Sequence, residues 1–161
     1  MLTILKGGIQ MDAIYKAKSL LSIEELEELD IPHEHGYVVG SLINDNRFPY
    51  IVGRIKRSAS AYMQFDWQVP IDRESTSKAT GFTDASGEII FFEDVLMEER
   101  IDIDDVSKEI YISLVEVSGL PCMLYLNKCE DYYEPFSKPQ ILKEWNTNAI
   151  KLKTNTKERY Y

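Results

Sequence analysis

The chain has 161 residues, of which 44% are hydrophobic, and a formal net charge of −9. This size fits one domain or two small ones, and the apolar content is sufficient for a buried core. No apolar run reaches the roughly 20 residues of a membrane-spanning helix, and the first residues lack the apolar segment of a signal peptide. Two cysteines, Cys122 and Cys129, do not make a disulfide scaffold. We therefore expect a cytoplasmic protein with free thiols.

The first part of the chain predicts short strands and one helix. We interpret residues 1–10 as a loose N-terminal extension and Met11–Lys18 as the start of the ordered chain, with a first strand. Ser22-Ile23-Glu24-Glu25 has the pattern of a capping box, so a short helix should begin there and end before Pro32. The next runs are rich in β-branched and aromatic residues and predict three strands, with a turn at Asn44-Asp45-Asn46 after the first: Tyr37–Ile43, Phe48–Ile55 and Ala61–Val69.

The middle of the chain alternates between polar and apolar segments. The polar run Asp72–Ala79 predicts a loop. Asp84-Ala85-Ser86-Gly87 has the composition of a turn, and Glu88–Met97 predicts one strand that is partly apolar on both faces.

The last third predicts a hairpin and a few shorter elements. Glu109–Val117 alternates regularly, Ser118-Gly119 suits a two-residue turn, and Leu120–Leu126 returns as the second strand. A short helix at Pro139–Trp145, a last strand at Ala149–Leu152 and a frayed end complete the chain. Short strands at regular spacing predict a mainly β fold, with small SH3-like barrels or a strongly bent antiparallel sheet and one or two short helices.

Acidic side chains are concentrated in two segments. The segment from Glu88 to Glu109 contains nine acidic and two basic residues, so its formal charge is −7. The segment Ser137–Tyr161, by contrast, has a formal charge of +4. The second acidic cluster is Glu24, Glu25, Glu27, Glu28 and Asp30. An acidic surface repels nucleic acid and attracts basic proteins. The alternative is that these acids only keep the protein soluble.

The sequence offers little catalytic chemistry. His33-Glu34-His35 supplies two metal-binding side chains, but zinc requires further ligands from elsewhere in the fold. Asp102-Ile103-Asp104-Asp105 lacks the glycine and the distal glutamate of a calcium loop, and no nucleophile elbow or phosphate-binding loop is present. We expect no enzyme, no cofactor and no metal. The remaining enzymatic alternative is a metal-dependent nuclease that uses Asp94 among its carboxylates.

Aromatic and basic residues in the middle of the chain support a second alternative. Tyr62, Phe65 and Trp67 could stack bases on a small barrel, as in OB-like folds. Basic side chains that could contact phosphates lie nearby in the sequence: Arg54, Lys56 and Arg57. The net negative charge opposes this interpretation, and aromatic strands more often form a core.

Several segments resemble the YopX-type proteins of phages and prophages. The N-terminal part of the resemblance lies in Tyr15–Lys18, Gly36–Ile43 and Phe48–Gly53. Ile71–Thr76, leading into Thr80-Gly81-Phe82-Thr83-Asp84 and Gly87, is similar to the central family run V-D-P-E-T-V-G-Q-Y-T-G-L-x-D-x-x-G-x-x-I-[FY]-E-G-D-I-V. The family proline, glycine and tyrosine are replaced by Arg73, Ser77 and Ala79, and its Glu-Gly-Asp is replaced by Phe92-Glu93-Asp94.

This resemblance covers residues 11–97. It implies a phage or prophage protein in a bacterial cell, with SH3-like β domains and no catalytic residue to transfer. We expect a YopX-like β domain at 11–97 and a β-rich C-terminal subdomain at 98–161 with a frayed tail, and residues 1–10 would be an upstream start or an added extension. Exposed strand edges would allow homo-oligomers.

Charge and resemblance together suggest a non-enzymatic interaction protein. Its partner would be the basic surface of a host protein, with a defence nuclease as one example, inhibited in the manner of an anti-CRISPR protein by carboxylates that mimic DNA. The candidate partner-binding residues are Glu98, Glu99, Asp102, Asp104 and Asp105. The alternative is a nucleic-acid- or nucleotide-binding barrel that acts in phage replication or regulation.

Overall fold

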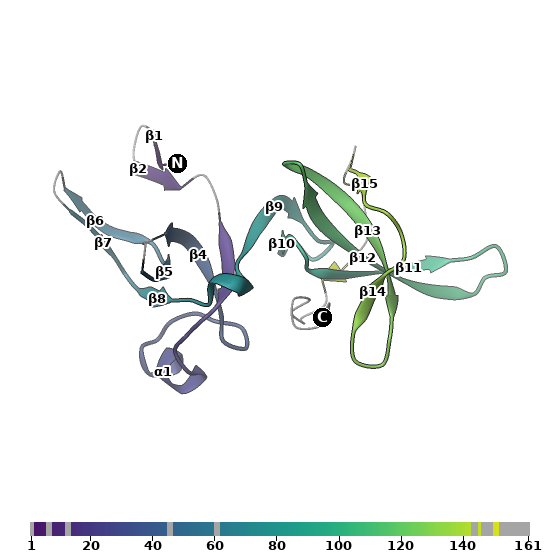
Figure 1. Cartoon of the computed structure of the whole chain (residues 1–161), viewed down its shortest axis with the longest axis horizontal. Coiled ribbons are helices and arrows are strands. Elements are labelled where there is room, and N and C mark those ends of the chain that lie inside the picture. The colour runs from purple at the N-terminus through teal and green to yellow at the C-terminus, as the bar shows by residue number, and fades with distance from the viewer. Residues whose placement is uncertain are drawn as a thin grey trace. The chain divides into compact units, whose positions relative to one another are not determined.

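The computed structural model describes residues 2–5, 8–11, 14–44, 47–59, 62–142, 145 and 150–151. Antiparallel strands dominate these residues, with one α-helix and one 3-10 turn among them (Figure 1). The expected mainly β fold is confirmed. No sheet within the described ranges closes on itself, which is consistent with the strongly bent antiparallel sheet rather than with a closed barrel. The chain divides into two compact units, 1–78 and 79–161.

The N-terminal unit begins with a two-stranded sheet. Strands β1 (Leu2–Leu5) and β2 (Gly8–Met11) pair antiparallel, with Leu2 opposite Met11 and Leu5 opposite Gly8. The interpretation of residues 1–10 as a loose extension is therefore wrong for their described part, since paired backbone groups hold it in a hairpin.

A four-stranded antiparallel set forms the centre of this unit. Its order is β3-β4-β5-β8. The bounds of the strands are β3 (Tyr15–Lys18), β4 (Tyr37–Asn44), β5 (Pro49–Val52) and β8 (Gln68–Pro70), and β6 (Ile55–Ala59) pairs with β7 (Tyr62–Phe65). The two long strands expected at Phe48–Ile55 and Ala61–Val69 are thus each divided in two. The expected turn residues 45–46 lie outside the described residues.

Helix α1 (Ile23–Glu28) begins as its sequence predicts. The Ser22 hydroxyl accepts a hydrogen bond from the Glu25 backbone N–H at 3.2 Å, and the Glu25 carboxylate accepts one from the Ser22 N–H at 2.8 Å. This reciprocal capping box satisfies two amides that the first helical turn leaves open. Leu26 is fully buried and contributes to the core of this unit, which consists of Ala17, Leu26, Ile31, Val38, Ile51, Val69 and Ile71.

Asp72–Ala79 was expected to be a loop, and this prediction is wrong in part. The 3-10 turn η1 (Arg73–Ser75) is followed by β9 (Ser77–Thr83). The Ser75 hydroxyl accepts a hydrogen bond from the Lys18 N–H at 2.7 Å. Backbone pairing with β3 holds Ser77 and Lys78 in the strand despite their polar side chains.

The C-terminal unit contains the longer strands. Its main sheet has the order β14-β13-β12-β11-β16, with β15 paired to β13, while β10 pairs with β9. The bounds are β10 (Ile89–Phe91), β11 (Val95–Ile101), β12 (Ser107–Val117), β13 (Leu120–Lys128), β14 (Tyr133–Pro135), β15 (Gln140–Ile141) and β16 (Ile150–Lys151). Ser118 and Gly119 both have positive φ, of 52° and 78°, as a two-residue hairpin turn of this kind requires.

Both faces of the main sheet bury apolar side chains. Successive residues of a strand point to opposite faces, so Leu96, Ile112 and Leu114 pack in one cluster with Ile90 of β10. Val95 and Tyr111 pack on the other face with residues of β13 and β14, in a cluster completed by Leu124, Leu126 and Tyr133. Because Ile90 and Leu96 pack with β12, their strands belong to the C-terminal unit, and the division lies at 78/79 rather than at the expected 97/98.

Two further predictions for this unit are wrong. The single strand Glu88–Met97 is broken after Phe91, because Glu93 adopts φ 72° and the buried Asp94 carboxylate accepts the Phe91 N–H at 2.9 Å. The expected helix at Pro139–Trp145 contains strand β15 instead, whose residues pair with β13.

Candidate functional site

The acidic segment forms a hairpin that extends beyond the main sheet. We call Glu98–Ile110 the acidic hairpin; it contains the end of β11, a turn and the start of β12. Within the described residues, β11 pairs with β16 only at Leu96 and Met97, and β12 pairs with β13 only from Tyr111 onward. In the described part of the chain, the remaining residues of the two strands pair only with each other. The hairpin is therefore a two-stranded ribbon that projects from the unit (Figure 1).

A tight turn closes the acidic hairpin. The Asp102 N–H donates to the Val106 carbonyl at 3.0 Å, and the Asp105 N–H donates to the Asp102 carbonyl at 3.0 Å. The Asp102 carboxylate accepts the Ile103 N–H at 2.8 Å, and Asp105 has a φ of 57°. A turn followed by a left-handed residue is a common three-residue hairpin loop, and aspartate tolerates that conformation better than most residues.

Like charges lie directly opposite one another in the ribbon. Glu99 pairs with Glu109, and Arg100 pairs with Lys108. Directly opposed like charges destabilise a strand pair. Hydrogen bonds partly compensate, because the Ser107 hydroxyl donates to Glu99 and the Tyr111 hydroxyl donates to Glu109.

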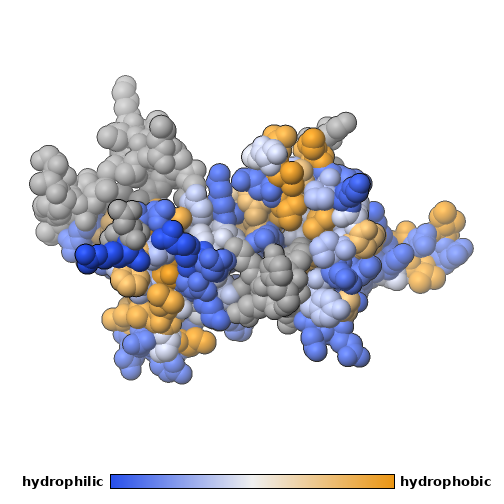
Figure 2. Space-filling model, in the orientation of Figure 1, coloured by the Kyte–Doolittle hydropathy of each residue, from blue (hydrophilic) through white to orange (hydrophobic). Residues whose placement is uncertain are grey.

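Three aliphatic side chains are exposed at the end of the same ribbon. Ile103 is 98% exposed, Ile101 is 76% exposed and Val106 is 62% exposed. Figure 2 shows hydrophobic side chains among hydrophilic ones at this end of the hairpin, at the right of the view. We call Ile101–Val106 the tip.

The five predicted partner-binding residues all lie in this hairpin, but they are not equivalent. Glu98 is paired with Arg100 at 3.0 Å, and its side chain is only 16% exposed. The hydrogen bond that Arg100 donates to the Glu98 carboxylate raises the pKa of Arg100. Asp102 organises the turn, whereas Glu99, Asp104 and Asp105 are exposed and carry the charge available to a partner.

The base of the acidic hairpin is anchored by a buried tyrosine. The Tyr111 ring lies 5.2 Å from the Tyr133 ring, between centroids, and the Lys128 Nζ lies 5.6 Å from the Tyr111 centroid. Burial, together with the hydrogen bond to Glu109, raises the pKa of Tyr111 to about 12. The phenol therefore stays neutral at physiological pH and holds one of the two opposed glutamates.

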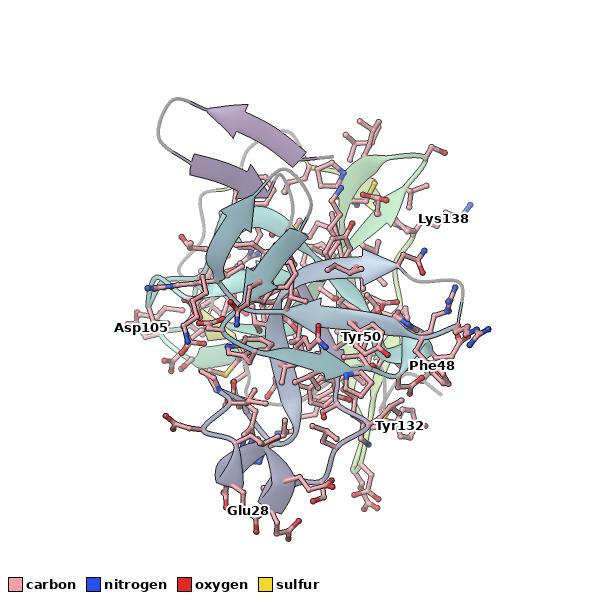
Figure 3. All side chains as sticks on the ribbon, turned by 90° about the vertical axis from the view of Figure 1, so that its left-hand side faces the viewer. Glu28, Phe48, Tyr50, Asp105, Tyr132 and Lys138 are labelled. Carbon is pink, nitrogen blue, oxygen red and sulfur yellow. The ribbon has the colours of Figure 1, made fainter. Side chains whose placement is uncertain are left out.

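The second acidic cluster lies on α1. Figure 3 shows acidic side chains of this helix, Glu28 among them, pointing away from the strands. Hydrogen bonds with its own backbone amide and with Ser22 lower the pKa of Glu24. Part of this cluster thus serves to start the helix.

The residues considered for metal or nuclease chemistry have structural roles. The His33 ring accepts the Gly36 N–H at 3.3 Å, and Asp94 is buried and stabilises its own turn. Asp84, which lies in the segment that carries the YopX-type resemblance, is also buried and accepts the backbone N–H groups of Ser86 and Glu88, both at 2.9 Å. In the described ranges, no three histidine, cysteine or acidic side chains come together as a metal site.

Trp67, one of the aromatic residues considered for stacking nucleic-acid bases, has a structural role. Trp67 packs partly buried against the core of the N-terminal unit, and a Cβ atom at Gly53 would come within 2.5 Å of its indole Nε1. Arg54 and Lys56 are exposed, while the side chains of Arg57 and Tyr62 lie outside the described part. The structure thus places Trp67 at the core rather than on an open platform.

Comparisons with protein-family models, with curated proteins and with solved structures gave no significant match for this chain. The YopX-type resemblance therefore remains a prediction. No helix among the described residues has the length and apolar character required to cross a membrane.

Sequence reasoning missed the apolar part of the site and one of its carboxylates. The acidic composition of this segment does not indicate that three aliphatic residues are exposed in it: Ile101, Ile103 and Val106. Their spacing was the available signal, since aliphatic residues interleaved with aspartates in a turn have no core to join. Glu109 was missed because its position opposite Glu99 depends on the register of the hairpin.

Proposed function

We propose that this chain is a non-enzymatic interaction protein of a phage or prophage that binds a basic surface of a host protein through the acidic hairpin. A nucleic-acid-binding defence nuclease is the partner class that this chemistry suits best. The observation that carries the proposal is the projecting ribbon in which Glu99 and Glu109 oppose each other. This arrangement destabilises the free hairpin, and lysine or arginine from a partner would relieve it.

Three other features support the proposal. The exposed acids stand on a ribbon whose edges pair with no other described strand, and every residue from Glu99 to Glu109 is exposed, so a partner can reach them. The net charge of −9 would steer the protein toward a basic surface and away from nucleic acid. Asp84 and Asp94, the acids that match the resembling family, stabilise turns, which leaves the acidic hairpin as the part specific to this chain.

Photo-crosslinking in bacterial cells tests the proposal. A photoreactive residue placed at Asp104 should capture a basic host protein, which mass spectrometry identifies and which is then purified. Replacing Glu99, Asp104 and Asp105 with lysine should weaken its binding at least tenfold at low salt, because each contact between opposite charges becomes a repulsion. The matched control carries the same three charge changes at exposed acids outside the hairpin: Glu130, Asp131 and Glu134.

Equal binding by both triple variants would contradict the proposal. Retention of the unmodified protein on single-stranded DNA, with quenching of Trp67 fluorescence, would favour the nucleic-acid-binding alternative instead.

A further inference from the structure

The tip of the acidic hairpin contains more apolar surface than a purely electrostatic contact can use. Ile103 is the most exposed large hydrophobic side chain among the described residues, at 98%. Ile101 and Val106, in the same turn segment, are exposed as well. A surface that only imitates phosphates needs carboxylates and gains nothing from aliphatic groups, which are unfavourable in water.

The turn holds the backbone of Ile103 in a defined position. Its N–H is bound by the Asp102 carboxylate, and two backbone hydrogen bonds close the loop around it. A loop whose backbone is already ordered loses less conformational freedom when it binds. Apolar anchors surrounded by charged groups are the usual centre of a protein interface.

We propose that Ile103 inserts into an apolar pocket of the partner protein, and that lysine or arginine side chains line the rim of this pocket. The inference rests on the proposed function and narrows its partner to a protein surface that is concave, apolar at the centre and basic at the edge. Asp104, Asp105 and Glu99 supply the negative charges that meet the rim.

The negative charge around Ile103 favours a basic protein pocket over a second copy of the chain, a lipid surface or nucleic acid. A second copy of the chain carries the same net charge of −9, so its acidic hairpin would be repelled rather than held. Anionic lipid surfaces and nucleic acid also repel the carboxylates around Ile103. A pocket with an apolar centre and a basic rim is compatible with both the apolar side chain of Ile103 and the carboxylates around it.

A synthetic pocket tests the inference without knowledge of the natural partner. Amino-substituted β-cyclodextrin has an apolar cavity with a cationic rim, neutral β-cyclodextrin has the cavity alone, and oligolysine has the charge alone. Each is titrated into the full-length, isotope-labelled protein at low salt, and amide chemical shifts report where it binds. We expect the amino-cyclodextrin to shift amides of the tip with a dissociation constant about tenfold or more below those of both controls.

Two variants identify the anchor. Ile103→Ser should remove the advantage of the amino-cyclodextrin over oligolysine, and its near-complete exposure means that the fold does not depend on it. Ile141→Ser, which changes an isoleucine that is 63% exposed on β15, should leave that advantage unchanged.

The outcomes separate the inference from the proposed function. If oligolysine and amino-cyclodextrin bind the acidic hairpin equally, or if Ile103→Ser binds like the unmodified protein, the apolar anchor is refuted while the basic partner stands. If neither cationic probe affects the hairpin, both are refuted.

Discussion

Replacing Glu99 with lysine should stabilise the folded protein. Glu99 lies directly opposite Glu109 in the ribbon, so the substitution turns a like-charge pair into an opposite-charge pair. The variant loses the hydrogen bond from Ser107 to Glu99, which lies at an exposed position and contributes little.

The size of the gain follows from the register. Two unit charges roughly 6 Å apart in water interact by about 0.7 kcal/mol, and salt reduces this further. Replacing one glutamate with lysine turns this repulsion into an attraction of similar size, so the interaction energy changes by about twice that value before screening. We therefore expect the free energy of unfolding to rise by about 1 kcal/mol at low salt, in agreement with the roughly 0.2–1 kcal/mol of cross-strand pairs.

Urea denaturation at low and high salt measures this gain. Glu130→Lys is the matched control, because it makes the same change of net charge at an exposed position outside the acidic hairpin. The double variant Glu99→Lys/Glu109→Lys restores a like-charge pair and should lose most of the gain. If Glu99→Lys stabilises no more than Glu130→Lys, or if the double variant keeps the gain, the two glutamates do not interact and the reasoning fails.

Three further predictions concern the C-terminal unit. Asp84→Ala should lower the free energy of unfolding by about 2–3 kcal/mol, because it removes the acceptor of two backbone N–H groups in a buried turn, and Asp84→Asn should cost clearly less in the same urea titration. Glu93→Gly should raise it by about 0.5–1 kcal/mol, because φ 72° strains every residue except glycine, and Glu93→Ala should show no such gain. The folded state holds the proton of Tyr111 more tightly than the unfolded chain, since its pKa is raised to about 12. Stability should therefore fall as the pH rises from about 10 to about 12, and Tyr111→Phe should reduce this fall in denaturation curves recorded by circular dichroism.

Elements specified by neighbouring residues could be predicted from the sequence. Ser22 and Glu25, three positions apart, together cap the start of α1. Ser118 and Gly119 form the two-residue turn that connects β12 to β13. In both cases the stabilising contacts lie within a few positions of the chain, so composition and spacing are sufficient.

Elements that depend on distant partners could not be predicted. Gln140 and Ile141 form a strand because β13 offers backbone groups to pair with, and nothing local distinguishes this from a helical turn. The break between β10 and β11 was missed for a different reason. It depends on a carboxylate that bonds a backbone amide three residues away, while the apolar pattern of Glu88–Met97 continues through it.

The location of the candidate site could be predicted from the sequence, but its organisation could not. The concentration of acids predicted where it lies, because charge density is a property of composition. Its organisation required the hairpin register, which places Glu109 opposite Glu99. It also required the ion pair of Glu98 with Arg100, two residues further along the same strand, which leaves Glu98 largely covered. The exposure of Ile103 could not be predicted, because an isoleucine in a β-rich sequence is normally expected in the interior.

The opposed charges of the acidic hairpin also bear on behaviour at high concentration. A ribbon whose edges pair with no other described strand, and whose end is aliphatic, is a template for stacking between molecules. Glu99 with Glu109 on one face, and Arg100 with Lys108 on the other, repel an identical ribbon that approaches in register. The pairs that weaken the single molecule therefore keep it dispersed, and a variant selected only for a higher melting temperature would be expected to precipitate at a lower concentration.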